Sequence, residues 1–549
     1  MARLALGLDS STQSLSAIIV DIDNAEKLFE HSLDYRRDDR INNFGIGHDY
    51  IIPPRVDGEA DQPPEMFLAS LDVMFNDFQT LGVAVEDIVL INSSGQQHGH
   101  VYLNDRAESQ FSQLREGGRG ELSLAMLLGG SFSYLTAPIW MTSNTINQAN
   151  CVRTGVGGSD TMIRLSGSNA PLRFTGAVIR RVAEQFPDVY RATENIQLIS
   201  SLIPSILTGN SKAPIDFGNA CGMSLMDYEK KNWSPELLKA TSEGLPGGAG
   251  ALAKKLPNLV PPDEVVGNIG TYFVEKYGFH PECKIITGSG DNPQAKTLVA
   301  GDLLSLGTSI VNMVSTGIDM RDLRGLANSM YDGIGRPFIF GCRTNGAMVW
   351  DRVRSLYGLE KKDYEQGEAA LKQVAPGSSM TFWQPNNESF PPSGSFDVIR
   401  VAPHADTGLA SDYSGVIDTS LAAVYVHSAQ FTGTGDVPLY VTGGATDSPG
   451  IMRRVAAIWN REVIPIEKGG PALGAAVAGI HAYCKSRNEP FCLEDYCRSV
   501  LRRSMPISPL PEDVAAYHLP GKYIEQFRVE EAKIITQHPI SQAPMNGEV

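Results

Sequence analysis

The chain has 549 residues, of which 42% are apolar, and carries 46 basic against 62 acidic side chains, giving a net charge of −16. This length exceeds what one hydrophobic core usually accommodates, so two large domains or three smaller ones are expected. The negative charge argues against nonspecific binding to nucleic acid or to an anionic membrane surface, and a site for an anionic cofactor would need a metal ion or local backbone donors.

The cysteines and the amino terminus bear on the compartment. The seven cysteines are an odd number and lack the paired spacing of a metal site, so they are interpreted as reduced thiols. The first residues lack an apolar signal core before Asp9, and no run of 18 apolar residues follows. The sequence therefore predicts a cytoplasmic protein without a membrane span.

The first structured segment is a strand over residues 4–8, followed by the polar turn 9–14 and a second strand over 15–20. The turn holds Asp9 and several hydroxyl side chains. Such a turn presents backbone N–H groups together and can bind phosphate oxygens, while an aspartate can hold Mg²⁺ through water. Taken alone, the segment is better interpreted as an ordinary polar turn.

Residues 31–64 contain paired prolines and are expected to form an elaborated loop, whereas apolar spacing predicts a helix over 64–82. A strand over 87–91 then ends in a polar cluster between two glycines, which contains Gln97 and His98. These side chains could hydrogen-bond a polyol, or they could belong to a solvated turn.

Residues 104–136 show little pattern and are expected to be rich in loops, and a short strand over 137–140 ends at Trp140. Trp140 stands beside polar side chains, a combination found in sugar sites, although a core tryptophan is a common alternative. A mostly helical region is predicted over 146–210.

Three further polar residues are weighed within or after this helical region. Arg173 could meet an anion but is better read as a surface residue near a helix start. Asp216 and Asn219 lie in a loop rich in glycine and asparagine, where closing an Asx turn is the preferred interpretation.

A short strand at 284–287 runs into a glycine loop that presents one carboxylate, Asp291, just before a predicted helix near Pro293. Two glycines flank Ser289 and allow a sharp turn there. A carboxylate at such a strand end can accept a proton from a hydroxyl group. The alternative is that Asp291 only caps the helix.

The second half of the sequence repeats the pattern of the first. Residues 302–314 form a strand, a turn of glycine and hydroxyl residues and a strand, as at the amino terminus. A strand with a double glycine follows at 439–448 and leads into a helix, and residues 471–479 predict a close-packed helix of small residues. From about residue 537 a loose polar tail is expected.

Five ordered motifs resemble those of the FGGY carbohydrate kinases and cover the chain from about residue 4 to residue 480. They are Gly7-Leu-Asp-Ser-Ser-Thr-Gln13, Ser94-Gly-Gln-Gln-His-Gly99, Gly290-Asp-Asn292, Ser305-Leu-Gly-Thr-Ser309 and Thr442-Gly-Gly-Ala445. The resemblance implies an α/β fold of two domains of the actin, hexokinase and heat-shock ATPase type around an interdomain cleft. Residues 1–297 would carry the sugar site and the catalytic base, and residues 298–549 the nucleotide site.

The resemblance also implies a role for particular residues. Asp291 matches the catalytic base and Asp9 the acid of the Mg²⁺ and phosphate site. The sugar would be met by Gln97, His98, Trp140 and Asn292. The ATP phosphates and adenosine would be met by Ser11, Thr12, Gln13, Gly307, Thr308, Gly443, Gly444 and Ala445.

The implied activity is ATP-dependent phosphorylation of a ketopentose, D-xylulose first, with ribulose or another ketose or polyol as alternatives. One departure bears on the sugar, because the family commonly carries an acid where this chain has Thr142, two residues after Trp140. A reading from another class is a sugar or nucleotide sensor without turnover. The resemblance requires no nucleic acid or membrane partner and is compatible with a homodimer.

Overall fold

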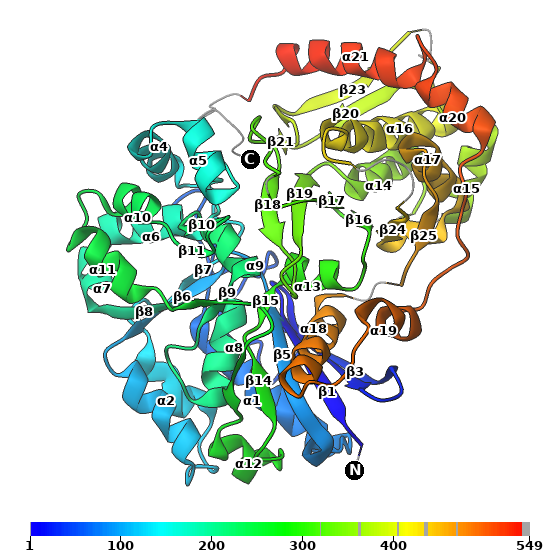
Figure 1. Cartoon of the computed structure of the whole chain (residues 1–549). Helices are drawn as coiled ribbons and strands as arrows, with labels where there is room; N and C mark the ends of the chain where they lie inside the picture. The colour runs from blue at the N-terminus through cyan, green and yellow to red at the C-terminus, as the bar shows by residue number, and fades with distance from the viewer. Residues whose placement is uncertain are drawn as a thin grey trace. The chain divides into compact units, whose positions relative to one another are not determined.

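The computed structural model describes residues 2–318, 320–360, 364–402, 406–432, 437–467 and 470–540, and the chain divides into two compact units (Figure 1). The first unit comprises Met1–Leu298, Met330–Pro337 and Gly469–Val500, and the second Val299–Ser329, Phe338–Lys468 and Leu501–Val549. Residues 470–500 thus pack with the first unit although they lie beyond residue 298. The predicted division into functional domains at 297/298 stays a prediction, because units of packing need not coincide with units of function.

The first unit is built on a seven-stranded sheet of order β13-β14-β5-β1-β2-β3, in which β15 also pairs with β5. Strands β1 and β2 form an antiparallel hairpin, while β1, β5 and β14 run parallel. The strands of this sheet are β1 (Leu4–Ser10), β2 (Ser14–Asp21), β3 (Glu26–Asp34), β5 (Ile88–Gly95), β13 (Val265–Asn268), β14 (Lys284–Ile286) and β15 (Ser289–Gly290).

Helices and short strands surround this sheet. The helices are α1 (Pro64–Thr80), α2 (Ala107–Glu116), α3 (Leu124–Leu128), α4 (Ile146–Gly155), α5 (Ser159–Ser166), α6 (Thr175–Gln185), α7 (Pro187–Ala192), α8 (Ile199–Thr208), α9 (Phe217–Ala220), α10 (Pro235–Ser242), α11 (Gly248–Lys255), α12 (Thr271–Tyr277), α13 (Asp291–Thr297), α18 (Gly470–Ser486) and α19 (Leu493–Val500). The short strands are β4 (Asp61–Gln62), β6 (His100–Asn104), β7 (Ala137–Pro138), β8 (Thr193–Leu198), β9 (Ile215–Asp216), β10 (Met226–Asp227), β11 (Asn232–Trp233) and β12 (Leu259–Val260).

Burial along the strands follows their position in the sheet. Every residue of the central strand β1 is buried, whereas β3 at the sheet edge is largely open to solvent. Helix α1 begins with Pro64 in its first turn and buries an apolar face in the same core as β1. The predicted helix over 64–82 is therefore confirmed to within two residues.

Helix α18 lies close against β1 and β5, as its small residues predict (Figure 1). A Cβ atom on Gly7 of β1 would lie 2.0 Å from the carbonyl oxygen of Ala472, and one on Gly474 would lie 2.0 Å from that of Gln294 in α13. No side chain fits at either position. Helix α18 therefore packs against β1, which carries the first motif, and against α13, which begins within the third motif.

The second unit repeats this plan in a six-stranded sheet of order β18-β19-β17-β16-β24-β25. Strands β16 and β17 form an antiparallel hairpin, and β24 and β25 continue parallel to β16, as β5 and β14 continue from β1. The predicted architectural repeat is confirmed. The strands of this sheet and the short strands that follow them along the chain are β16 (Asp302–Leu306), β17 (Ile310–Ser315), β18 (Asn328–Tyr331), β19 (Pro337–Arg343), β20 (Thr381–Gln384), β21 (Glu388–Ser389), β22 (Pro392–Ser393), β23 (Phe396–Arg400), β24 (Leu439–Thr442) and β25 (Val463–Pro465).

Helices pack on this second sheet and form a separate apolar core with it. They are α14 (Ala347–Leu356), α15 (Tyr364–Gln373), α16 (Leu409–Ser428), α17 (Pro449–Trp459), α20 (Pro511–His518) and α21 (Tyr523–Gln537). The polar tail predicted from about residue 537 begins where α21 ends, and its residues from 541 onward lie outside the described residues.

Two expectations about local structure need correction. Residues 104–136 contain α2 and α3 rather than mainly loops, because each of these helices is short and buries only a few apolar side chains, among them Phe111, Leu114, Leu124 and Leu128, which is too few for a long periodic pattern. The strand expected over 87–91 continues to Gly95, since its polar end pairs with β1 up to Ser10.

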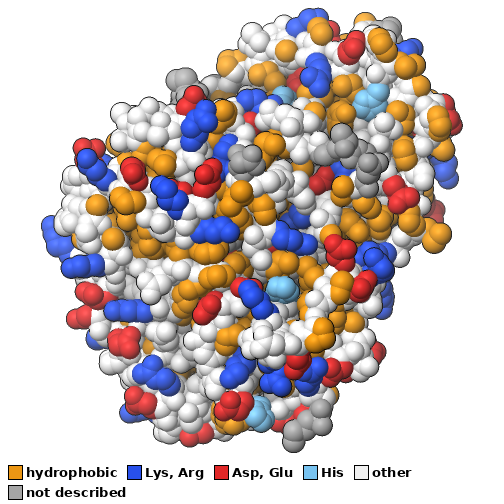
Figure 2. Space-filling model, in the orientation of Figure 1, with side chains coloured by type: hydrophobic (Ala, Val, Ile, Leu, Met, Phe, Trp, Pro, Cys, Tyr) orange, Lys and Arg blue, Asp and Glu red, His pale blue; other side chains and the backbone are white. Residues whose placement is uncertain are grey.

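The described part of the chain also bears on membranes and thiols. Within it, no helix is both long enough and apolar enough to cross a bilayer. All seven cysteines are free thiols. On the face shown in Figure 2, lysine and arginine side chains are interspersed with acidic ones rather than gathered in one basic patch.

Candidate active site

The carboxyl ends of three neighbouring strands bring the predicted acids of the first unit together. Asp9 of β1 pairs in register with Ser94 of β5, and Ser94 pairs with Ser289 of β15. Asp291 follows β15 directly as the first residue of α13. Motifs nearly 300 residues apart in sequence therefore meet at one edge of one sheet.

Asp291 does not act as the cap of α13. The N-cap residue is Gly290, and its position carries no side-chain capping bond. Asp291 is only partly buried, and its Oδ1 accepts hydrogen bonds from the N–H of Asn292 (2.7 Å) and from Asn292 Nδ2 (3.0 Å). Burial, and then the nearby charge of Asp9, raise the pKa of Asp291 to about 7. A carboxylate of this kind suits proton transfer near neutral pH.

Two amide side chains hold this carboxylate in place. Asn292 Nδ2 bonds both Asp291 Oδ1 and, at 2.9 Å, Gln97 Oε1. Gln97 is 4% exposed and packs tightly on Gly290, where a Cβ atom would lie 2.5 Å from Gln97 Cγ. The predicted residues Gln97, Asn292 and Asp291 thus form one hydrogen-bonded chain.

Asp9 is almost fully buried, with 6% of its surface exposed. Burial raises its pKa to about 6, an effect that the Ser94 hydroxyl partly offsets. Among the described residues its Oδ1 finds no hydrogen-bond partner. An orphaned buried carboxylate oxygen is the kind of atom that a cation or its water would satisfy.

This observation allows a test of the Mg²⁺ prediction. Mg²⁺ binds oxygen atoms and is often held by one or two carboxylates while it keeps several waters. Asp9 alone, with Asp291 nearby, fits that pattern. The described residues contain no group of three or more His, Cys, Asp or Glu side chains that could form a complete protein cage.

Trp140 is tied into a ring of polar side chains beside this edge. Its indole is 44% exposed, and its Nε1 donates to Thr12 Oγ1 at 2.8 Å. Thr12 Oγ1 donates to Gln96 Oε1 (3.2 Å), Gln96 Nε2 to Gln62 Oε1 (2.7 Å), and Gln62 Nε2 to the carbonyl of Thr12 (2.8 Å). An exposed aromatic face on a fixed polar frame is suited to stacking on a sugar.

His98 lies in the interior and carries no charge at neutral pH. It is 6% exposed, its ring stacks on Phe174 at 4.3 Å, and Nδ1 donates to the carbonyl of Gly222 at 2.8 Å. Burial, followed by the charge of Arg173, lowers the His98 pKa to about 3. Because Nδ1 carries the proton, Nε2 is left as an acceptor for a hydroxyl group.

Arg173 was interpreted from the sequence as a surface residue. The structure places it half-buried and near His98, so it belongs to the same neighbourhood. Thr142 is buried, at 2% exposure, and its Oγ1 donates to the carbonyl of Ala60 at 3.2 Å. The missing acid is therefore not replaced by an exposed hydroxyl at that position.

The first predicted phosphate turn is internally bonded. Ser11 Oγ accepts from the N–H groups of Gln13 (3.4 Å) and Ser14 (3.1 Å) and donates to the Ser14 carbonyl (3.0 Å). Gln13 is exposed, while Ser11 and Thr12 are half-buried. Two of the backbone donors expected for phosphate are therefore occupied by Ser11 itself.

The second unit gathers the remaining predicted residues at the corresponding edge of its own sheet. Gly307 and Thr308 form the turn between β16 and β17, and Ser305 pairs with Thr442 of β24. Gly443 approaches so closely that a Cβ atom would lie 2.3 Å from the Leu306 carbonyl oxygen, whereas Gly444 faces open space. Gly443, Gly444 and Ala445 thus lie beside the turn.

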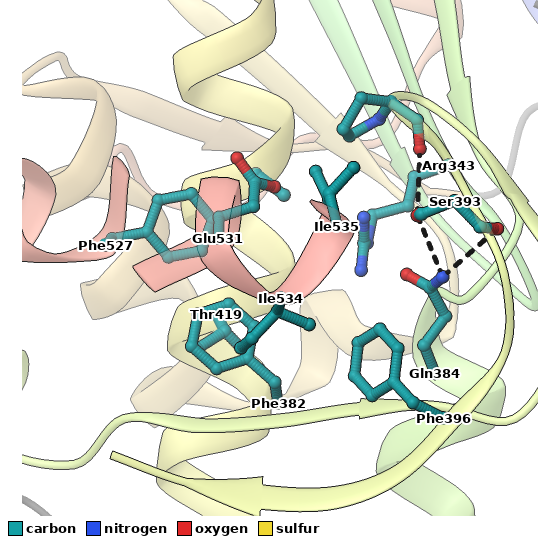
Figure 3. A pocket seen from close by; sticks show the side chains of 12 residues that line it. Arg343, Phe382, Gln384, Ser393, Phe396, Thr419, Phe527, Glu531, Ile534 and Ile535 are labelled. Atoms are coloured by element: carbon teal, nitrogen blue, oxygen red, sulfur yellow. Dashed lines mark hydrogen bonds between the residues drawn. The ribbon is translucent and has the colours of Figure 1, made fainter. Parts of the chain in front are cut away.

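A small pocket of the second unit lies on the β20, β22 and β23 side of α21 (Figure 3). Phe527, Glu531 and Ile535 of α21 line it together with Arg343 and Gln384. Its volume of about 10 Å³ is the space of roughly one water molecule. This volume excludes it as a site for a sugar or a nucleotide.

Asp216 has a second contact, close to Asp291, that the sequence does not reveal. The predicted Asx turn is confirmed, since Asp216 caps α9 by accepting from the N–H groups of Gly218 (2.8 Å) and Asn219 (3.2 Å). The same carboxylate also accepts from Ser289 Oγ at 2.7 Å, two residues before Asp291. Burial raises the Asp216 pKa to about 7. The link joins segments 73 residues apart, and no local pattern signals it.

The two sheets, each opened by a hairpin with a hydroxyl turn, define the class of actin-like and hexokinase-like folds. A solved structure of this fold is ligand-bound xylulose kinase from Lactobacillus acidophilus, which is 17% identical and has a TM-score of 0.77, covering 97% of this chain and 98% of that one. The fold predicted from the sequence is confirmed.

Sequence comparison finds similarity to carbohydrate kinases. Residues 135–297 match the N-terminal domain of the FGGY family of carbohydrate kinases. The chain is 29% identical over 512 residues to xylulose kinase 2 of Arabidopsis thaliana, covering 89% of this chain and 88% of the relative. It is 28% identical over 532 residues to xylulose kinase of Mus musculus, covering 93% and 91%.

Proposed function

We propose that this chain transfers the γ-phosphoryl group of ATP to the terminal hydroxyl group of D-xylulose, giving D-xylulose 5-phosphate and ADP. Its relatives named xylulose kinase support the substrate. The observation that carries the proposal is the placement of Asp291, a partly exposed carboxylate with a raised pKa, held by Asn292 and Gln97 at the sheet edge that also carries Asp9.

In the proposed reaction Asp291 binds the sugar hydroxyl group and takes its proton as the oxygen attacks the γ-phosphorus. The bond from that phosphorus to the ADP oxygen breaks, and ADP leaves. Positioned general bases typically contribute roughly 10²- to 10⁴-fold to rate. Fixing Oδ1 through Asn292 and Gln97 keeps the carboxylate aligned, which matters because catalysis falls steeply with misplacement.

The sugar would lie against Trp140 and accept or donate hydrogen bonds at Gln97, His98 and Asn292. The Thr12 hydroxyl group bonds Trp140 and Gln96, so the Thr12 side chain would hold Trp140 in position for the sugar. The Thr12 backbone would bind phosphate together with Ser11 and Gln13. To admit phosphate at the turn, Ser11 Oγ would give up the N–H groups that it now accepts from.

The nucleotide would be bound by the second unit. Gly307 and Thr308 would meet its phosphates, and Gly443, Gly444 and Ala445 would meet the adenosine, since an unobstructed double glycine lets a flat group approach the backbone. Asp9 would hold Mg²⁺ through water, and the bound ion would neutralise charge on the phosphates.

A second candidate substrate is ribulose or another ketose or polyol. The observation that favours it is Thr142, because a site without the family's acid discriminates less through a charged hydrogen bond. Domains bounded at 297/298, a cytoplasmic location and a homodimer complete the proposal. The homodimer is checked by light scattering of the purified chain.

The proposal is tested by ADP release with a panel of ketoses and polyols in the presence of ATP and Mg²⁺. D-xylulose is expected to give the highest kcat/KM, and the product is expected to carry phosphate on carbon 5. A higher kcat/KM for ribulose would identify ribulose as the preferred substrate. ATP binding without ADP release for any sugar would favour a sensor.

A further inference from the structure

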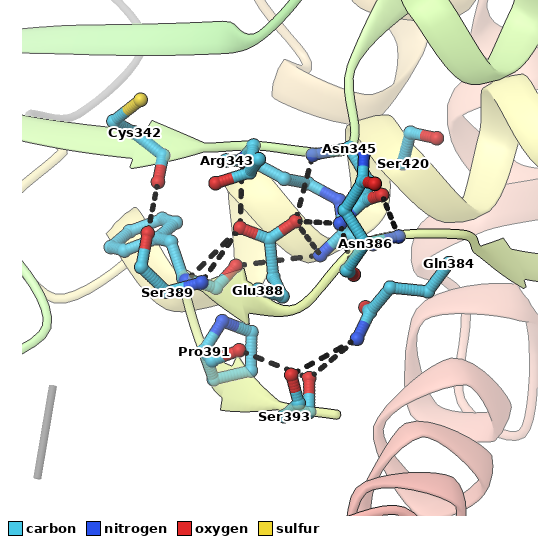
Figure 4. Close-up of polar contacts among 12 residues, drawn as sticks. Cys342, Arg343, Asn345, Gln384, Asn386, Glu388, Ser389, Pro391, Ser393 and Ser420 are labelled. Atoms are coloured by element: carbon cyan, nitrogen blue, oxygen red, sulfur yellow. Dashed lines mark hydrogen bonds and ion pairs between the residues drawn. The ribbon is translucent and has the colours of Figure 1, made fainter. Parts of the chain in front are cut away.

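Glu388 is a buried carboxylate of the second unit that the reaction described above does not use. It is fully buried, at 0% exposure, in the β21–β22 hairpin. Its Oε1 accepts from the N–H groups of Thr344 (2.7 Å), Ser389 (2.9 Å) and Phe390 (3.3 Å), and its Oε2 accepts from the N–H (2.9 Å) and Nδ2 (2.9 Å) of Asn345. Figure 4 shows this group of donors converging on one side chain.

The donors to Glu388 come from two different segments of the chain. Those of Ser389 and Phe390 are local to the hairpin, whereas Thr344 and Asn345 belong to the turn that joins β19 to α14. Asn345 is tied to the hairpin a second time, since its Nδ2 donates to the Asn386 carbonyl (3.0 Å) and its Oδ1 accepts from the Asn386 N–H (3.1 Å). Glu388 therefore fixes a turn that lies more than 40 residues away in the sequence.

The 344–346 turn and the start of α14 contact the 307–309 loop between β16 and β17. The first N–H groups of α14, from Ala347 and Met348, donate to the carbonyls of Gly307 (2.9 Å) and Thr308 (3.4 Å). At Gly346 the backbones nearly touch, because a Cβ atom there would lie 2.6 Å from the N atom of Ile310 and from the carbonyl carbon of Ser309. Each residue of the 307–309 loop is thus in contact with the start of α14.

We propose that Glu388 is a positioning residue for the nucleotide phosphates, acting through the 344–346 turn and the first turn of α14 to set the conformation of the Gly307–Thr308 loop. The inference rests on the proposed function, since it takes that loop to bind ATP. Glu388 itself would touch neither ATP nor sugar.

The physical reason lies in the acceptor-only chemistry of a carboxylate. The five N–H groups that bond Glu388 are donors, and so is the Arg343 guanidinium, whose Nη1 lies 3.9 Å from Oε2, so each needs an acceptor. A glutamine at this position is of the same size, but its NH₂ group would face two or three of those donors whichever way it turned. Buried donors without acceptors are expensive, and the turn would shift to find others. The loop that α14 supports would shift with it.

The test compares Glu388→Gln with a matched control, Gln384→Glu. Gln384 is 3% exposed and lies close by, and its Nε2 donates to Ser393 Oγ (2.9 Å) and to the carbonyl of Gly394 (2.7 Å), which lie on the far side of the hairpin from the turn (Figure 4). The control substitution is also isosteric. Like Glu388→Gln, it replaces a buried side chain whose hydrogen bonds are satisfied by one that mismatches its partners. It has no bond to the turn or to α14.

Binding of ADP and ATP is measured by calorimetry, and KM is measured separately for ATP and for D-xylulose. For Glu388→Gln we expect the nucleotide Kd and the KM for ATP to rise about tenfold, which corresponds to one mismatched buried group, with the KM for sugar changed less than about twofold. For Gln384→Glu we expect a comparable loss of Tm with both KM values close to those of the wild type.

Three results would overturn the inference: an unchanged nucleotide Kd in Glu388→Gln, an equal rise in Gln384→Glu, or a rise in the KM for sugar as large as that for ATP. If Glu388→Gln does not fold, Asn345→Ala removes one donor and the bonds to Asn386, and a rise in nucleotide Kd of about threefold is expected. An unchanged Kd there would equally reject it. A wild type that binds ATP but phosphorylates no sugar contradicts the proposed function, and the Kd comparison still decides the role of Glu388.

Discussion

The pH dependence of sugar phosphorylation follows from the environment of Asp291. An aspartate with its ordinary pKa of 3.8 would be fully ionised above pH 6, and the rate would not change there. Burial and the charge of Asp9 raise the pKa to about 7, so the ionised fraction should rise about tenfold between pH 6 and pH 8. We expect kcat/KM for D-xylulose to rise by about the same factor.

The assay is coupled detection of ADP from pH 5.5 to 8.5 at constant ionic strength, with saturating ATP and Mg²⁺. Sugar is the varied substrate, because kcat/KM for sugar at saturating ATP reports ionisations of the nucleotide-bound enzyme before sugar binds. A kcat/KM that is constant from pH 6 to pH 8, or a midpoint near pH 4, would show that Asp291 does not titrate near pH 7 as the base.

Asp9→Asn identifies which group titrates. Removing the charge of Asp9 should lower the Asp291 pKa and move the rise to lower pH, because Asp9 is the second cause of the shift. Activity itself should also fall, since Asp9 is the proposed Mg²⁺ residue. A midpoint that stays in place would assign the titration to ATP or to another group.

Three further predictions follow from the same contacts. The raised pKa means that the neutral form of Asp291 stabilises the fold below about pH 4 and that this contribution is lost as pH rises through about 7, so Asp291→Asn should gain Tm over the wild type at pH 8 but not at pH 4. Equal differences at both values would contradict this. Asp216→Ala leaves Ser289 Oγ and two N–H groups without a buried acceptor and should lose about 1–3 kcal/mol of stability per group, with a lower kcat, both of which Asp216→Asn partly restores. No loss in thermal unfolding and kinetics would rule out that support. Thr12→Val removes the acceptor of Trp140 and should raise the KM for sugar about threefold to tenfold while leaving the KM for ATP unchanged. The reverse pattern would assign the Thr12 side chain to phosphate.

Much of the fold could be predicted because its signals are local. The hairpin over 4–20 and its counterpart over 302–315 each pair a buried strand with a polar turn and a second strand, and both are present. The helix at 64–80 follows from its apolar spacing and its starting proline. These features depend on neighbours within a few residues.

The chemistry of the site was harder to predict where one side chain serves two segments. Thr12 was assigned to the phosphate loop because of its place in a motif, yet its hydroxyl group bonds Trp140 and Gln96, which are 128 and 84 residues away. Asp216 was read as a turn residue, and that is correct, but the same carboxylate also holds Ser289. A motif gives position along the chain and does not give the partners that a fold supplies.

The contacts of Glu388 could not be predicted either, because no motif marks this residue. Its sequence surroundings, Asn-Asn-Glu-Ser-Phe, contain no motif and no periodic pattern. Its function as an anchor exists only because β19 and the β21–β22 hairpin come together. Residues of this kind are visible only once the backbone donors around them are accounted for.

Whether Asp291 is the base is decided by comparing ATP binding and sugar phosphorylation in Asp291→Ala. We expect a nucleotide Kd within about twofold of the wild type, with turnover of D-xylulose reduced by about 10² to 10⁴. Turnover close to that of the wild type would show that another group primes the hydroxyl, and the assignment of Asp291 as the base would be wrong.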